Sequence, residues 1–146
     1  MDIKIKIIFI AFIIVSQLGC DVMDKTKLKI YNFSQDTVFC IVTTDPFFSD
    51  VKRSPLEQSQ TVIGSDTAFI LNNNLLFPGD SSLFASYDWR YLINTSNSKK
   101  ITIYFFKYKT LKSKSWEEIR EKSIYDKKII LNIEALDACN WIVNYK

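Results

Sequence analysis

Short apolar segments separated by polar turns follow one another from residue 28 onwards, and most of them have the composition of β-strands. Residues 28–33 and 37–43 are rich in β-branched and aromatic side chains, and the polar cluster at 34–36 between them predicts a hairpin. Residues 101–108 alternate imperfectly between apolar and polar, which predicts a central strand buried on both faces. Further strands are expected at residues 67–71, 82–87, 127–131 and 141–145.

Helix start signals occur at three places. Ser54 followed by Pro55 and Glu57 can cap a single turn, and Ser115 followed by Glu118 forms a capping box for a helix that runs to about residue 122. Asn132 can cap a second short helix over residues 133–139. The sequence therefore predicts a mainly β fold: a single antiparallel sandwich or curled-sheet domain with two short helices near the C-terminus.

The N-terminal segment has a different pattern. Lys4 and Lys6 precede an unbroken apolar run over residues 7–15. This run is shorter than the roughly 20 apolar residues that span a bilayer, so it is typical of a signal peptide and not of a transmembrane anchor. An ordinary secreted protein and an uncleaved signal anchor are the alternatives to a lipoprotein.

The end of this segment, Leu18-Gly19-Cys20, resembles the lipobox of bacterial lipoproteins, although Gln17 stands where that family usually places a leucine. The resemblance implies cleavage before Cys20 and a diacylglyceryl thioether on its sulfur. We therefore expect a signal peptide at 1–19, a lipid-anchored tether at 20–27 and a single mainly β domain at 28–146. The expected location is the cell envelope, on the periplasmic side or the outer-membrane surface, with acyl chains on Cys20 holding the protein to the membrane.

A second resemblance covers residues 101–145. Trp116-Glu117-Glu118-Ile119-Arg120 and the closing stretch Asn140-Trp141-Ile142-Val143-Asn144-Tyr145 follow a pattern that is similar to a group of uncharacterised small lipoproteins from Bacteroidota. The resemblance implies an envelope location and no particular activity.

Charge and composition exclude several classes of function. Nineteen Lys and Arg against 16 Asp and Glu give a net charge of +3, and the basic residues are scattered, so we expect no binding of nucleic acid. The chain has no histidine, which removes the commonest general base and zinc ligand, and no phosphate-binding loop. We expect no cofactor, no metal and no catalytic residue in a binding or structural module whose partner is an unknown envelope protein or glycan.

A carboxylate-dependent hydrolase acting on envelope glycan or polysaccharide is the alternative, since two loop aspartates could face each other across a cleft. Its candidates are Asp45, Asp50, Asp66, Asp80 and Asp88.

Three further groups of residues are candidates for structural or binding roles. Cys40 and Cys139 could form a disulfide in an oxidising compartment or remain two separate core thiols. Tyr87, Trp89 and Tyr91 alternate along an expected strand and could present an aromatic face to sugar rings, or form part of the core. The apolar residues could likewise form a protein-docking patch or part of the core; they are Phe47, Phe48, Leu75, Leu76 and Phe77.

Overall fold

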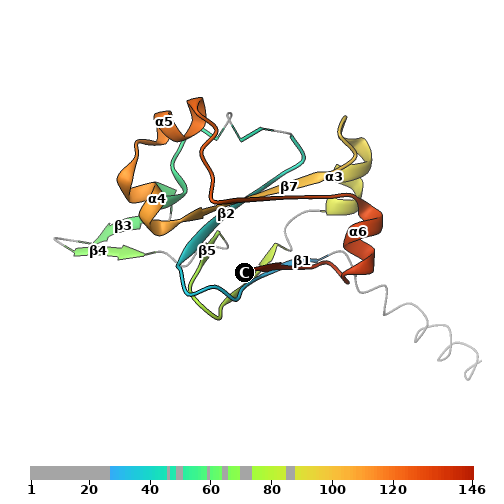
Figure 1. The fold of residues 1–146 in the computed structure, drawn as a ribbon, viewed down its shortest axis with the longest axis horizontal. Coiled ribbons are helices and arrows are strands. Elements are labelled where there is room, and N and C mark those ends of the chain that lie inside the picture. Colours follow the sequence, from blue (N-terminus) through green and yellow to red (C-terminus); the bar gives the residue numbers. More distant parts are fainter. Residues whose placement is uncertain are drawn as a thin grey trace, which may run out of the picture.

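Two β-sheets, a separate two-stranded ribbon and a set of short helices make up the fold in Figure 1, a computed structural model. The structure describes residues 27–45, 47–48, 51–58, 60–63, 66–69, 74–84 and 88–146. The strands are β1 (Leu28–Asn32), β2 (Val38–Thr43), β3 (Gln60–Ile63), β4 (Asp66–Phe69), β5 (Leu75–Leu76), β6 (Ser81–Phe84), β7 (Ile101–Lys107), β8 (Lys127–Leu131) and β9 (Ile142–Tyr145). The helices are α2 (Pro55–Gln58), α3 (Trp89–Thr95), α4 (Tyr108–Ser113), α5 (Trp116–Glu121) and α6 (Ile133–Ala138).

The strands fall into separate sheets. A four-stranded antiparallel sheet has the order β5-β2-β7-β8, and a three-stranded sheet has the order β6-β1-β9. Strands β1 and β6 are antiparallel, whereas β1 and β9 are parallel, and β3 pairs with β4 as a separate antiparallel ribbon. The mainly β, sandwich-like fold class is therefore confirmed, with one parallel pair in place of purely antiparallel pairing.

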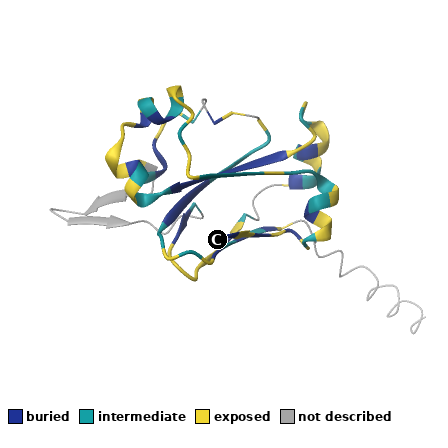
Figure 2. Cartoon of the chain, in the orientation of Figure 1, coloured by how far each residue is buried: buried dark blue, intermediate teal, exposed yellow. Residues whose placement is uncertain are grey.

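The main core lies between the two sheets. Ile30 on β1 and Val143 on β9 face Ile103 and Phe105 on β7, and all four side chains are buried. Helices α3 and α6 close this core with Ile93 and Leu136, which are fully buried. Figure 2 shows the resulting distribution, with buried residues along the strands and exposed residues on the outward sides of the helices.

A second core covers the other face of the four-stranded sheet. Tyr104 and Phe106 point away from the first core and pack with Trp116 and Ile119 of α5. The Trp116 ring lies 5.7 Å from the Phe106 ring, and its indole nitrogen donates a hydrogen bond to the carbonyl of Val51. Strand β7 is thus central and buried on both faces, as the sequence indicated, and Trp116 docks α5 on the sheet.

The expected helix caps are present. Ser115 Oγ accepts a hydrogen bond from the Glu118 amide at 3.1 Å, and Asn132 Oδ1 accepts one from the Ala135 amide at 3.0 Å. At α2, Ser54 Oγ accepts from the Leu56 amide. These side chains satisfy amides that have no partner within the first turn of a helix.

The expected hairpin between residues 28–33 and 37–43 is wrong, because β1 and β2 belong to different sheets. The cause is the buried side chain of Asn32. It bonds to Ser34, to the Asp36 carbonyl and to the Leu76 carbonyl of β5, and these bonds turn the chain out of one sheet and into the other.

The structure also contains elements that the pattern did not indicate, namely β3, α3 and α4. Strand β5 contains Leu75 and Leu76, which were expected to lie between turns. No helix in the described part of the chain is long and apolar enough to cross a membrane.

Candidate functional site

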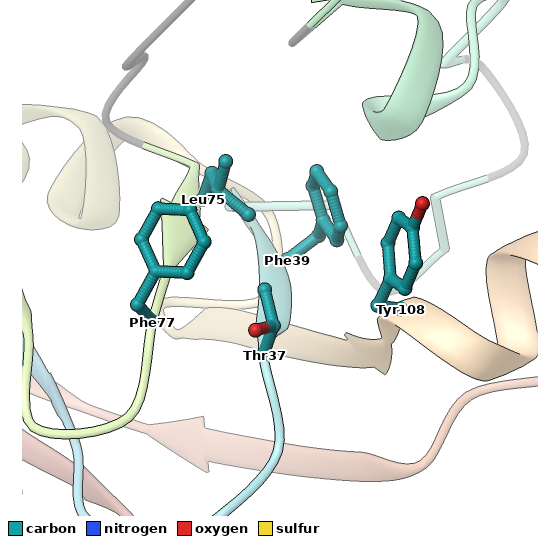
Figure 3. A pocket seen from close by; sticks show the side chains of 5 residues that line it. All are labelled: Thr37, Phe39, Leu75, Phe77 and Tyr108. Atoms are coloured by element: carbon teal, nitrogen blue, oxygen red, sulfur yellow. The ribbon is translucent and has the colours of Figure 1, made fainter. Parts of the chain in front are cut away.

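An apolar pocket of about 240 Å³ opens at one end of the four-stranded sheet. Figure 3 shows the described side chains that line it: Thr37, Phe39, Leu75, Phe77 and Tyr108. They come from the start of β2, from β5 and the residue after it, and from the start of α4. The pocket therefore joins three parts of the sequence that are far apart.

The pairing register of β2 and β5 positions the two buried side chains at the floor of the pocket. Phe39 on β2 pairs with Leu75 on β5, and both are buried. The Tyr108 amide donates to the Thr37 carbonyl at 2.9 Å, which holds the first turn of α4 against the start of β2. The Phe39 and Tyr108 rings consequently stack, with centroids 6.4 Å apart and planes inclined by 21°.

A tight turn holds Phe77 at the mouth of the pocket, where its side chain is 40% exposed. The Asp80 amide donates to the Phe77 carbonyl, and the Phe77 amide donates back to the Asp80 carboxylate. Gly79 has a φ of 84°, a conformation that glycine adopts without strain. Its amide donates to the carbonyl of Asn32, so the turn is attached to β1.

The side chain of Asn32 holds β5, which lines the pocket, against the loop that follows β1. It is fully buried, and its amide nitrogen donates to the Asp36 carbonyl at 2.8 Å and to the Leu76 carbonyl at 3.1 Å. Its oxygen accepts from the amide and the hydroxyl of Ser34. A buried amide with both donors and its acceptor satisfied is a specific and rigid support.

Charged groups lie around the pocket and not in its lining. Lys107 and Asp36 form an ion pair at 2.6 Å. The hydrogen bond from Lys107 lowers the pKa of Asp36, and the same bond raises the pKa of Lys107. On α4, the ammonium of Lys112 lies 5.2 Å from the centre of the Tyr108 ring, within cation–π range.

The lining indicates which chemistry the pocket suits. Three aromatic rings and one leucine offer dispersion contacts and burial of apolar area, while the hydroxyls of Thr37 and Tyr108 can orient a ligand. Pockets for drug-sized ligands usually measure about 300–1,000 Å³, so this one suits a smaller group, such as an aromatic ring or the end of an acyl chain.

The strand on which Tyr87, Trp89 and Tyr91 were expected to alternate is wrong for the two residues that the structure describes, and of the two alternatives Trp89 takes the core role. Trp89 and Tyr91 lie in α3 and not in a strand, so residues two apart point in different directions. Trp89 is 4% exposed and its indole nitrogen donates to the Phe84 carbonyl, whereas Tyr91 is 64% exposed. Tyr87 lies outside the described residues.

The two cysteines are separate free thiols, so the disulfide alternative is not what the structure contains. Cys40 is fully buried in the core between the sheets, and burial raises the pKa of its thiol to about 12. Cys139 ends α6, and its thiol donates to the Leu136 carbonyl at 3.3 Å. Cys20, the expected lipidation site, lies outside the described residues.

Two of the aspartates considered for a hydrolase, Asp80 and Asp88, have structural roles. Asp88 accepts the Tyr91 amide at the start of α3, and Asp80 accepts the Phe77 amide. The Asp45 amide donates to the Thr43 hydroxyl. Asp50 and the side chain of Asp66 lie outside the described residues.

Phe47, Phe48 and residues 75–77, candidates for a docking patch or for the core, do not form one surface. Phe48, Leu75 and Leu76 are buried. Phe47 and Phe77 are exposed and line two different pockets. Sequence reasoning therefore found two lining residues of the apolar pocket but missed the other three, which have no shared local signal.

Within the described ranges, no group of three or more Asp, Glu, Cys or His side chains could hold a metal ion. Comparison of the chain with protein-family models, with curated proteins and with solved structures finds no match. The resemblance to small Bacteroidota lipoproteins therefore stays a prediction.

Proposed function

We propose that the chain is a lipid-anchored envelope protein whose folded part is a non-enzymatic binding module. The anchor is supported by the sequence alone, by the basic start, the apolar run over residues 7–15 and the Leu18-Gly19-Cys20 end. Acyl chains on Cys20 would hold the protein on a bilayer without help from other apolar surface, since each buried methylene contributes about 0.8 kcal/mol.

The binding role is supported by the apolar pocket. Phe39 and Leu75 form its floor, and Phe77 stays 40% exposed at its mouth although an aromatic side chain gains free energy from burial. A largely apolar pocket with two hydroxyl groups fits an aromatic or acyl group of a partner or ligand. Nothing in the described residues favours the hydrolase over this reading.

The anchor is tested by the intact mass of the membrane-extracted protein beside a Cys20→Ala variant. The expected mass is that of residues 20–146 plus acyl groups, and the substitution should abolish it. A chain without acyl groups that starts at another residue would overturn the lipoprotein proposal.

The pocket is tested with 1-anilinonaphthalene-8-sulfonate as a fluorescent probe of residues 21–146. Dye emission should rise with the unaltered chain and fall several-fold with Phe77→Ala, because this substitution opens the mouth of the pocket. Tyr91→Ala is the control, since it removes an exposed aromatic side chain from α3, away from the pocket. Equal emission from both variants would overturn the binding role of the pocket.

A further inference from the structure

The outer face of the three-stranded sheet carries exposed apolar side chains. The side chains that point away from the core are Lys29 and Tyr31 on β1 with Phe33 directly after it, Ser81 and Leu83 on β6, and Ile142 and Asn144 on β9 with Lys146 directly after it. The exposed fractions of Phe33, Leu83 and Ile142 are 57%, 43% and 40%. None of these outward positions is acidic, and two are lysines.

Register makes these side chains one continuous surface, which we call the outer sheet face. Lys29 is paired with Leu83 on one side and with Ile142 on the other, so the three form a row across the sheet. Tyr31 occupies the next outward position on β1, and its ring stacks on that of Phe33 with centroids 5.7 Å apart. The ammonium of Lys29 lies 4.6 Å from the centre of the Tyr31 ring.

We infer that the outer sheet face lies against the bilayer that holds the acyl chains of Cys20. This inference rests on the proposed lipid anchor. The face combines aliphatic and aromatic side chains with lysines, whose long stems let the ammonium reach lipid phosphates while the rest contacts acyl chains.

The length of the tether supports this placement. Residues 21–27 are all that separate Cys20 from the first residue of β1. Seven residues span at most about 25 Å when fully extended, whereas a domain of this size is about 35 Å across. The row of Lys29, Leu83 and Ile142 lies at the end of β1 that follows the tether, so it stays near the membrane.

The opposite side of the molecule has a different chemistry. There α4 and α5 cover the four-stranded sheet, and their exposed residues include lysines together with Glu117 and Glu121. Glu118 is paired with Lys114 and Lys122. The charges on this side are of both signs, whereas the outward side chains of the outer sheet face include two lysines and no carboxylate.

The test places a tryptophan on each side of the lipidated full chain. Phe33→Trp reports on the outer sheet face, and Tyr125→Trp is the matched control, since Tyr125 is 40% exposed and contacts the Tyr104 ring on the helix side. Each protein is reconstituted into vesicles of phosphatidylcholine and phosphatidylglycerol, with or without brominated chains. The signal of the unaltered protein is subtracted, because its three tryptophans are at most 7% exposed.

Brominated lipid should quench roughly half or more of the added Phe33→Trp emission and leave that of Tyr125→Trp almost unchanged, since an interfacial side chain enters only about 5–10 Å into the bilayer. Adding Leu83→Glu and Ile142→Glu to Phe33→Trp should abolish the quenching. Leu83 and Ile142 are both exposed, so these substitutions should leave the fold intact. Circular dichroism of the variant checks that the fold is retained.

Three outcomes would overturn the inference. Chains that do not float with the vesicles lack the anchor, and the placement fails with it. Floating chains in which the two tryptophans are quenched equally, or not at all, retain the anchor but have another orientation or carry a protein partner on this face. Quenching that survives Leu83→Glu and Ile142→Glu belongs to the tether and not to the outer sheet face.

Discussion

Replacing Asn32 by alanine should be one of the most destabilising single polar substitutions in the domain. The side chain is fully buried and makes four hydrogen bonds, two to Ser34 and one each to the carbonyls of Asp36 and Leu76. Ser34 and Asp36 are partly exposed, so water can replace the lost partner there. Leu76 is buried, and its carbonyl cannot recover in this way.

The expected loss of stability follows from the burial of each hydrogen-bond partner. A buried polar group that loses its partner costs about 1–3 kcal/mol, and the bonds at the partly exposed positions add roughly 1 kcal/mol together. Asn32→Ala should therefore lower the free energy of unfolding by about 2–4 kcal/mol. Asn32→Asp keeps the shape and the acceptor but loses both donors, and it should be at least as destabilising.

Urea unfolding of residues 21–146, followed by tryptophan fluorescence and extrapolated linearly, measures this change. Asn144→Ala is the control, because Asn144 is exposed on β9 and its loss should change stability by less than about 0.5 kcal/mol. If Asn32→Ala matched that control, the side chain would not hold β1 to β5, and the explanation of the corner between the sheets would be wrong.

Three other predictions concern a helix end, the thiols and acid stability. Ser123 has a φ of 50° where α5 ends, so Ser123→Gly should raise the free energy of unfolding by roughly 1 kcal/mol; a decrease on urea unfolding would contradict the strain argument. Iodoacetamide should label Cys139 in the folded domain, and Cys40 only after unfolding because burial raises its thiol pKa to about 12; mass spectrometry showing equal labelling would disprove this. The pKa of Asp137 is lowered by the hydrogen bond from Trp141 and then by that from Arg90, so its stabilisation is present above about pH 4 and is lost at lower pH. Asp137→Asn should therefore weaken the fall in melting temperature below pH 4, and an unchanged fall would contradict the role of this carboxylate.

Local signals predicted local structure well. Ser115 and Asn132 cap helices where the sequence indicated, because a capping side chain and the amide it accepts are only three residues apart. Strand β7 could be identified as central because an apolar run without clear alternation is typical of burial on both faces.

Pairing and long-range placement could not be predicted in the same way. The pattern over residues 28–43 fits a hairpin as well as a corner, and only the bonds of Asn32 to Asp36 and Leu76 distinguish the two. The alternation of Tyr87, Trp89 and Tyr91 covers too few residues to separate a strand from a helix, and Asp88 proved to be a helix cap. The pocket combines residues 37, 39, 75, 77 and 108, whose proximity depends on the sheet order.

The parallel pairing of β1 with β9 has a consequence for biosynthesis. Strand β1 leaves the ribosome first among the described strands, yet it occupies the centre of its sheet and needs both β6 and β9 as neighbours. One edge of β1 therefore has no strand partner until residue 145 has been made. This sheet cannot be completed strand by strand during synthesis, and the free edge of β1 has to be kept from pairing with other strands until β9 emerges.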